Sequence, residues 1–390
     1  IYNWNNQTDI DNDQIKAKIE ELQIQSDDSS EGVIFRHLLA TGTANETEAP
    51  RVPIYVKSPL LESHWEELKS LNPGLYAAAR AYYVYARAVN DFDSSSLRIN
   101  VTVPALRDLK REVLETGSKS ATAIASIWLS MELTLANPIQ AINELEYALP
   151  HLPTRSSRLT LENALDSSTA HEWLRIAFTE LSVPSRAFTH SMKIIEQSKL
   201  NDVFVTWAYF TSVDSLLLQS KYEDALLISD RALEFVKTRN SELEMFLTLY
   251  QRLRVLMMGF RRTHDSEILS VINKIDTLDI DKTKINPEEL VYLYQSYKAI
   301  VKNNERQLSL SVNKFEDVVL KKLTSAEFKK EYLLRKELEL IRIYDTAGNY
   351  EKAYEHSKAY NQLLFEKNTE QFQFSSSNFS NSIAKDIELA

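Results

Sequence analysis

The sequence predicts an all-α protein in which antiparallel helix pairs stack into one right-handed superhelix. Glycine is scarce, at 6 of 390 residues, and proline is low at 10, whereas sheet proteins need both in their turns. Apolar residues recur at helical spacing along most of the chain. A short pattern that begins a helix also returns several times. We therefore expect helix for most residues and essentially no strand.

The N-terminal part, residues 1–58, is expected to hold one helix followed by a polar loop. Residues 11–25, DNDQIKAKIEELQIQ, read as a short helix with an acidic first turn. The segment after it is polar and contains Pro50 and Pro53, which indicates a loop.

Residues 59–120 predict irregular helical hairpins that cap the array. Two helices should be separated by a break at Asn72, Pro73 and Gly74, and another helix should begin near Pro104. Terminal repeats are usually atypical because one of their faces meets water, so this region fits a cap.

The clearest copy of a repeated unit is GNYEKAYEHSKAY, residues 348–360. Gly348 can adopt the left-handed conformation that ends a helix, and a second helix should run from about Tyr350 to Glu366. Ala353 is expected where this helix crosses the preceding one, because a small residue lets two backbones approach closely.

Other copies show the same small residue in their second helix. Tyr222 and Ala225 repeat the spacing of Tyr350 and Ala353, and Ala232 follows one heptad later on the same face. The anchors of successive units are Ala141, Ala187, Ala225, Ile268, Ser309 and Ala353. Residues 121–367 should therefore contain about six helix pairs.

These residues resemble the tetratricopeptide repeat, whose units are two antiparallel helices over roughly 34 residues. The best-matching positions are Tyr222, Ala225, Ala232, Tyr344, Gly348, Tyr350 and Ala353. The resemblance implies a tetratricopeptide-like α-solenoid with a concave groove lined by the first helix of each pair. The units of this chain are longer than the family norm.

Residues 368–390 are expected to form a tail or a linker helix toward a following segment. Phe372, Phe374 and Phe379 lie in a Gln/Ser/Asn-rich run, after which SIAKDIELA restarts a helix. This layout, with a start at Ile1 and no cysteine, resembles the periplasmic sensor part of bacterial membrane-bound GGDEF (diguanylate cyclase) or histidine-kinase signalling proteins. That resemblance implies an extracytoplasmic location, an anchoring transmembrane helix outside this sequence, and a full-length receptor that could be a homodimer.

Composition excludes several classes of function. The net charge is −10, with 45 basic and 55 acidic residues, so an acidic chain without a basic stripe favours neither nucleic acid nor membrane surfaces. No apolar run is long enough for this segment to insert into a membrane. The absence of cysteine excludes disulfides and thiolate metal sites.

Catalytic motifs were not found, so we expect no enzyme activity in this segment, no cofactor and no metal. The seven histidines are scattered, and HEWLR at 171 lacks the second histidine of a zinc helix. We expect His171 and Glu172 on the surface or in the groove. No GxSxG elbow and no Gly-rich phosphate loop occur.

Candidate binding residues are those that helical repeats would place on the inner helices. We expect the groove to be lined by Trp207, Phe210, Asp214, Tyr294, Arg335 and Arg342. Aromatic rings supply contact area, and guanidiniums pair with carboxylate or phosphate. Because the aromatic and arginine sets lie three units apart, we expect an extended peptide or protein segment as the partner.

Three functions follow from this pattern. The first is a non-catalytic extracytoplasmic sensor or protein-interaction module of a membrane signalling protein. The second is a soluble tetratricopeptide-like adaptor that assembles a protein complex. The third is a helical-toroid hydrolase, which would need facing acids in a cleft.

Overall fold

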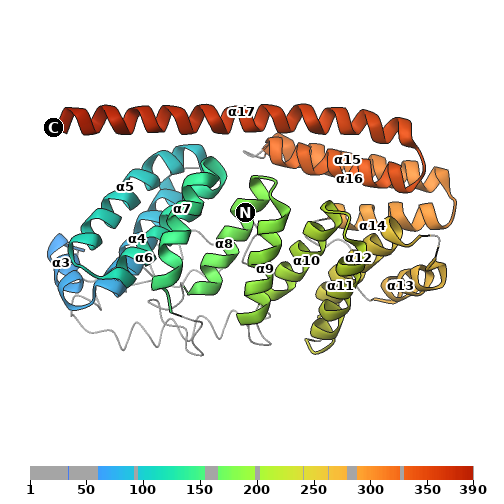
Figure 1. Ribbon diagram of the computed structural model, residues 1–390, viewed down its shortest axis with the longest axis horizontal. Helices are drawn as coiled ribbons and strands as arrows, with labels where there is room; N and C mark the ends of the chain where they lie inside the picture. The colour runs from blue at the N-terminus through green and yellow to red at the C-terminus, as the bar shows by residue number, and fades with distance from the viewer. Residues whose placement is uncertain are drawn as a thin grey trace. The chain divides into compact units, whose positions relative to one another are not determined.

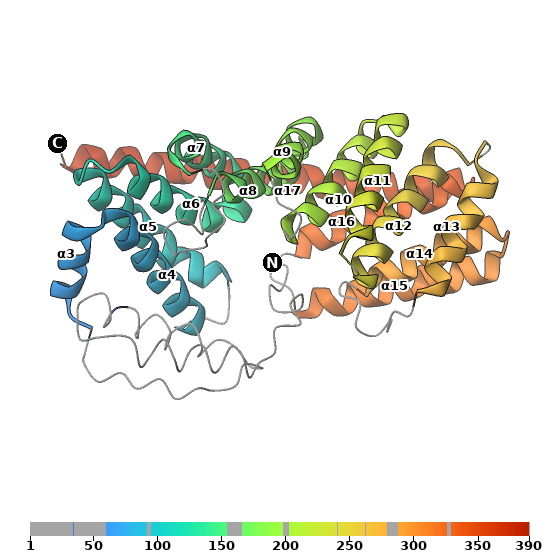
Figure 2. The same ribbon diagram turned by 90° about the horizontal axis from the view of Figure 1, so that it is seen from below.

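The structure is a computed structural model that describes Ile34 and residues 60–91, 95–153, 166–197, 203–239, 241–261, 263–278, 288–325 and 329–389. Every regular element in these ranges is a helix (Figures 1 and 2), which confirms the all-α prediction. The expectations for residues 1–58, including the helix at 11–25, lie outside the described residues apart from Ile34.

The chain folds as two compact units. Unit 1 comprises residues 1–133 and 140–170, and unit 2 comprises residues 134–139 and 171–390. These units do not test where a cap gives way to regular repeats, so the expected boundary near residue 120 stays a prediction.

Unit 1 is a set of helices around an alanine-rich core. Its elements are α3 (Glu62–Leu71), α4 (Pro73–Asp91), α5 (Ser95–Glu115), α6 (Lys119–Ala136), α7 (Pro138–Ala148) and a short 3-10 turn, Leu149–His151. The predicted break stands at Asn72, whose Oδ1 accepts a hydrogen bond from the N–H of Leu75 at 3.1 Å. Proline at the first position of α4 costs nothing there, because that N–H has no helical partner.

Helix α5 begins nine residues earlier than the sequence suggested. It starts at Ser95 rather than near Pro104, which lies inside the helix. The exposed Pro104 removes one backbone hydrogen bond, but Val103, Leu106 and Leu109 bury one side of α5 in the core. Packing therefore outweighs the local preference of proline to start a helix.

Unit 2 contains ten helices in the part of it that the structure describes. They are α8 (Ser167–Glu180), α9 (Pro184–Gln197), α10 (Val203–Leu218), α11 (Tyr222–Lys237), α12 (Glu242–Gly259), α13 (Asp265–Thr277), α14 (Glu289–Val301), α15 (Glu305–Ser325), α16 (Lys329–Thr346) and α17 (Tyr350–Leu389). Successive helices pack as pairs joined by short turns. The division between the two units falls within the range of α8.

The anchor positions of the repeated unit lie in the second helix of each pair. Ala225 is 0% exposed and packs among Val213, Leu216 and Ile228. Ala353 is 8% exposed at the start of α17, which packs on α16. Burial of both alanines, as the repeat pattern predicts, is confirmed.

Two glycines are required by local geometry, one by its backbone conformation and one by a close contact. Gly348 has a φ of 77°, so it ends α16 in the left-handed conformation that was expected. Gly259 closes α12, and a Cβ atom there would lie 2.5 Å from Cβ of Tyr222. The beginning of α11 therefore packs directly on the end of α12.

Helix α17 is longer than the sequence suggested. It runs for 40 residues without interruption (Figure 1), whereas we expected the helix to stop near Glu366 and to restart in the tail. Residues 367–389 contain neither glycine nor proline, so nothing in the sequence breaks the helix. The helical alternative for residues 368–390 therefore agrees with the structure, whereas a break near Glu366 does not.

The packing at Ala225 yields a testable prediction. Ala225→Leu should lower the free energy of unfolding by about 1–3 kcal/mol, because the added atoms have no space between α10 and α11. Leu227→Ala, at a 52% exposed position on the same helix, serves as the control and should stay within about 0.5 kcal/mol. Urea unfolding measures both. Equal midpoints for the Ala225 variant and the wild type would contradict the helix pairing.

Candidate partner-binding site

The inner helices of unit 2 close around α12. Helix α12 contacts α10, α14 and α16 as well as its outer neighbours α11 and α13. Between Glu244 and Met257 every residue of α12 is buried except Met245 and Arg252. A first helix of an open solenoid would leave one side to solvent, so the inner side of α12 is covered by its neighbours.

Four charged residues, which we call the charge cluster, join the inner helices. They are Asp214 on α10, Arg254 on α12, and Glu339 and Arg342 on α16. Nη1 of Arg254 lies 2.7 Å from Oδ1 of Asp214, and Nη1 of Arg342 lies 3.6 Å from the same oxygen. The cluster thus connects α10 with α16, three helix pairs later in the sequence.

The two acids of the charge cluster are bonded differently. Oε1 of Glu339 accepts hydrogen bonds from Nη2 of Arg254 at 3.0 Å and from Nη1 of Arg342 at 2.7 Å. Oδ1 of Asp214 lies at ion-pair distance from both guanidiniums, but its contact with Arg342, at 3.6 Å, is too long for a hydrogen bond. The side chain of Glu339 is 8% exposed, whereas that of Asp214 is 30% exposed. Asp214 is therefore the outer and more weakly held acid.

Electrostatics favours the charged forms of Asp214 and Arg254. Burial raises the pKa of Asp214, but the guanidiniums of Arg254 and Arg342 outweigh burial and bring this pKa below its ordinary value. Burial lowers the pKa of Arg254, whereas Asp214 and Glu339 raise it well above its ordinary value. Removing one partner would leave a buried charge unpaired, which costs about 3–5 kcal/mol in other proteins.

The two predicted aromatic residues lie on the same side of α10 as Asp214. Trp207, Phe210 and Asp214 follow one another at helical spacing, and the ring centroids of Trp207 and Phe210 are 5.7 Å apart. Both rings are half-buried, with one side packed on the core of unit 2. Arg335 is also half-buried, and its charge helps to lower the pKa of Asp214.

The structure changes the predicted arrangement of these residues. Asp214, Arg335 and Arg342 lie around one point, so the aromatic and arginine sets adjoin and are not separated along an extended groove. The sequence argument failed because it treated the array as open, whereas α16 packs back onto α12. Their role in binding a partner stays a prediction.

Tyr294 does not lie in this group. It is 3% exposed in the core, its hydroxyl donates to Oδ1 of Asp276 at 2.8 Å, and its ring packs edge-on against Phe246. We therefore correct its assignment to the groove. Its position on α14 faces α13 and α12 rather than the charge cluster.

Sequence reasoning missed Arg254 and Glu339. Arg254 lies in the run LYQRLRVLMM, between Leu253 and Val255 and one turn before Met257 and Met258. An arginine among so many apolar residues is expected to be buried, and it then needs acidic partners from other helices. That signal was present, although it could not identify Glu339 or Asp214 as the partners.

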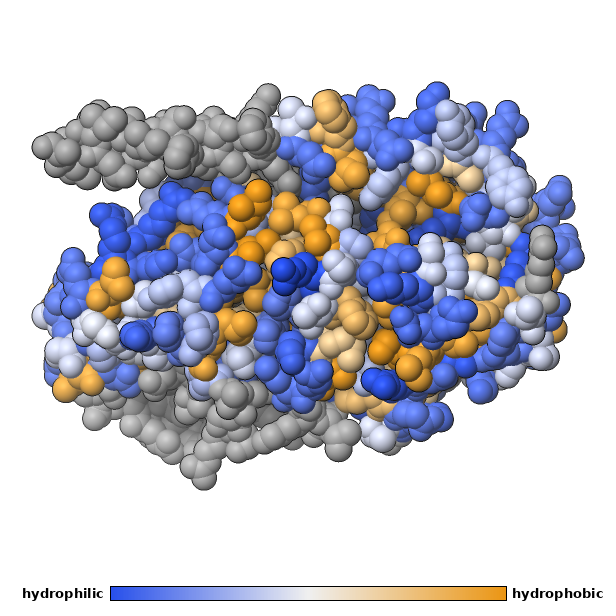
Figure 3. Space-filling view, in the orientation of Figure 1, coloured by the Kyte–Doolittle hydropathy of each residue, from blue (hydrophilic) through white to orange (hydrophobic). Residues whose placement is uncertain are grey.

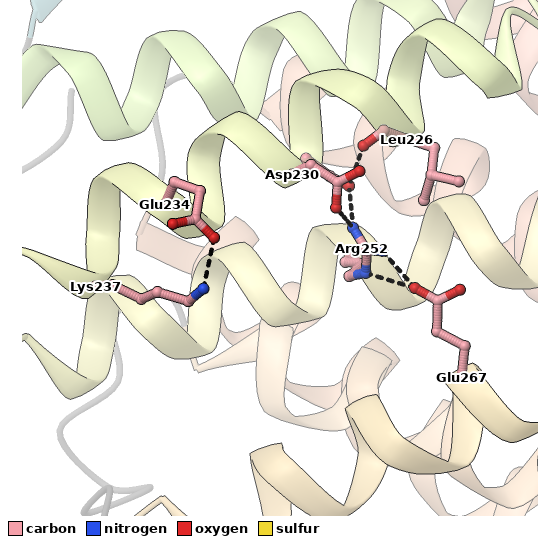
Figure 4. Close-up of polar contacts among 7 residues, drawn as sticks. Leu226, Asp230, Glu234, Lys237, Arg252 and Glu267 are labelled. Carbon is pink, nitrogen blue, oxygen red and sulfur yellow. Dashed lines mark hydrogen bonds and ion pairs between the residues drawn. The ribbon is translucent and has the colours of Figure 1, made fainter.

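A second arginine of α12, Arg252, forms ion pairs with the outer helices. Arg252 pairs with Asp230 of α11 and with Glu267 of α13, to which its Nε donates at 3.0 Å (Figure 4). Nη1 of Arg252 also donates to the hydroxyl of Ser229 at 3.1 Å. These partners belong to the adjacent second helices, so Arg252 ties neighbouring pairs together.

Apolar side chains on the outer helices do not form a site of their own. Leu227, Leu269, Leu310 and Tyr354 are exposed, each one or two residues after an anchor position. In Figure 3 the apolar residues on the visible face are interspersed with hydrophilic ones. Scattered exposed apolar residues are normal on protein surfaces.

Two histidines, the buried His171 and the half-buried His190, form a pair between α8 and α9. Nδ1 of His171 lies 3.0 Å from Nδ1 of His190, and Phe178 stacks on the His190 ring. The expectation that His171 and Glu172 lie on the surface or in the groove is wrong, because both are buried. Burial and the neighbouring His171 and Arg186 lower the pKa of His190 to about 4, and burial and Lys193 lower the pKa of His171.

The comparisons with known proteins concern the fold. No protein-family model matches the chain, and no curated protein matches its sequence. Solved structures do match. The apo form of RapI has a TM-score of 0.58 at 14% identity, and the match covers 93% of each chain. A Rap protein complexed with competence and sporulation factor has a TM-score of 0.52 at 10% identity, over 92% of this chain and 93% of that one.

A third structure, aspartyl phosphate phosphatase F from Bacillus subtilis, has a TM-score of 0.54 at 12% identity, over 90% of this chain and 88% of that one. Such low identities show a shared fold and nothing finer. The chain therefore has a tetratricopeptide-like helical-repeat fold, as its sequence predicted. The resemblance to periplasmic GGDEF or histidine-kinase sensors stays a prediction.

The histidine pair predicts how stability depends on pH. Both rings are neutral when folded, whereas the unfolded chain takes up protons below its ordinary histidine pKa of 6.5. The free energy of unfolding should therefore keep its full value above pH 6.5 and decrease as the pH drops toward about 4. A loss on the order of 2 kcal/mol is expected.

Urea unfolding at pH 7.5 and 5 measures this loss. Because other groups of the protein also titrate over this range, the wild type is compared with His190→Gln, whose amide does not titrate. The variant should lose less stability on acidification than the wild type. Identical losses would contradict a pair that stays neutral in the folded protein.

Proposed function

We propose that this chain is a non-catalytic helical-repeat module that binds a peptide or a segment of a partner protein and acts as an adaptor. The fold supports this, because stacked helix pairs present their inner helices as a continuous binding surface. One structure of similar fold is a Rap protein complexed with competence and sporulation factor, so the fold is compatible with a bound factor.

The observation that carries the proposal is the composition of the surface around Asp214. Trp207 and Phe210 present half-buried rings beside the half-exposed charges of Asp214 and Arg335. Aromatic residues and arginine are the residue types enriched in protein interfaces, and they supply most hot spots. Rings fixed on one side against a core also lose little side-chain entropy when a partner binds.

The adaptor is favoured over the membrane sensor because it needs only this surface. Among the described residues, no helix combines the length and the apolar character that crossing a bilayer requires. The sensor remains the second candidate, since a chain of 390 residues without cysteine suits an oxidising compartment. An extracytoplasmic location, a membrane anchor and a homodimeric receptor belong to that candidate.

We propose no hydrolase activity. A helical-toroid hydrolase needs one acid that can donate a proton near neutral pH. The two acids of the charge cluster are both paired with Arg254 and Arg342, and the pKa of Asp214 lies below its ordinary value. Asp214 is therefore unsuited to act as a general acid.

Selection from a random peptide library displayed on phage tests the proposal. The wild type should enrich peptides that an unrelated helical-repeat protein does not retain. Trp207→Leu, which keeps apolar contact with the core but removes the ring, should weaken their binding about tenfold, or about 1.4 kcal/mol. Melting curves establish that the variant is folded.

The matched control is Tyr354→Ala, which removes an exposed ring from the outer helix α17. Its affinity for the same peptides should stay within about twofold. The proposal fails if no peptide is enriched, or if Trp207→Leu and Tyr354→Ala bind the selected peptides as well as the wild type does.

A further inference from the structure

The guanidiniums of Arg254 and Arg342 are held in place from one side. Glu339 accepts a hydrogen bond from each of them, and Gln251 Oε1 accepts another from Nη1 of Arg254 at 2.7 Å. Arg254 is 1% exposed and Arg342 is 6% exposed. The two groups are thus positioned by partners that would stay in place if Asp214 moved away.

On the side away from Glu339, Asp214 is the one acid among the described residues that contacts both guanidiniums. Asp214 Oδ1 is buried against both guanidiniums, yet it lies 3.6 Å from Nη1 of Arg342, which is beyond hydrogen-bond distance. Guanidiniums bind carboxylates best through directed, often bidentate, hydrogen bonds. The contact of Asp214 is therefore weaker than the geometry of two arginines permits.

We propose that Arg254 and Arg342 form a carboxylate-binding site that Asp214 fills in this structure, and that a carboxylate of the partner segment replaces Asp214 there. This inference rests on the proposed function and specifies its anchor chemistry. The incoming carboxylate would accept directed hydrogen bonds from both guanidiniums, while Asp214, already 30% exposed, turns toward solvent.

The site already holds a carboxylate, that of Asp214, which favours a carboxylate over a phosphate as its ligand. The two guanidiniums that contact Asp214 and the Glu339 carboxylate together carry one net positive charge, to which Arg335 adds a second from outside this contact. A phosphate dianion would bring its second charge close to the Glu339 carboxylate, and like charges repel strongly where water is excluded. The adjoining rings of Trp207 and Phe210 would then contact the residues that flank the bound carboxylate.

Chemical rescue of Asp214→Ala tests the site. The variant should have a lower melting temperature than the wild type, because the two guanidiniums lose one of their two acidic partners. Sodium formate should raise its melting temperature in a saturable way, by at least about 2 °C more than sodium chloride at equal ionic strength. The wild type should respond to the two salts equally. Should Asp214→Ala not fold, Asp214→Ser takes its place.

Arg342→Lys in the Asp214→Ala background is the matched control, because it keeps the charge but not the fork of donors. This double variant should lose at least half of the difference in melting temperature between formate and chloride. Acetylglycylglycine then presents a chain-terminal carboxylate, and acetylaspartyl amide presents a side-chain carboxylate. The one that stabilises Asp214→Ala more identifies the source.

The two proposals fail in different ways. Equal effects of formate and chloride on Asp214→Ala overturn the carboxylate site, whatever the peptide selection yields. A formate effect that survives Arg342→Lys also overturns it. Peptides enriched without any formate effect would leave the adaptor function standing and place its contacts elsewhere on the module.

Discussion

The arrangement of unit 2 depends on how Arg254 is neutralised. A guanidinium that is 1% exposed must have acidic partners within reach, since an unpaired buried charge is very unfavourable. Its partners are Asp214 on α10 and Glu339 on α16, so both helices must lie against α12. Buried ion pairs add little net stability compared with apolar residues. Their role here is to specify which helices meet.

This constraint explains why α12 and α14 are buried on nearly all sides. With α16 packed back onto them, the inner face of these pairs is a core rather than an open channel. What remains accessible lies at the edge of the charge cluster, around Asp214, Arg335 and the rings of α10. The binding surface that we propose is therefore compact, and it adjoins the interaction that holds the inner helices together.

Local features of the sequence predicted the helix pairs, but they did not predict that α16 packs back onto α12. Gly348 and the crossing alanines mark turns and contacts between helices that are adjacent in the sequence, so the pairs and their anchors could be located. The start of α5 and the continuity of α17 were missed, because packing and the absence of breakers outweighed single residues and composition. Asp214 and Arg342 were named as separate inner residues, since periodicity says nothing about helices three pairs apart in the chain.

A double-mutant cycle between Asp214 and Arg342 tests most directly whether α10 and α16 meet at the charge cluster. Urea unfolding is measured for the wild type, Asp214→Ala, Arg342→Ala and the double variant, all at neutral pH. If α10 and α16 meet at the charge cluster, the two substitutions should couple by about 0.5–3 kcal/mol. Additive effects, within about 0.3 kcal/mol, would contradict the account, because residues on helices that do not meet have no reason to couple.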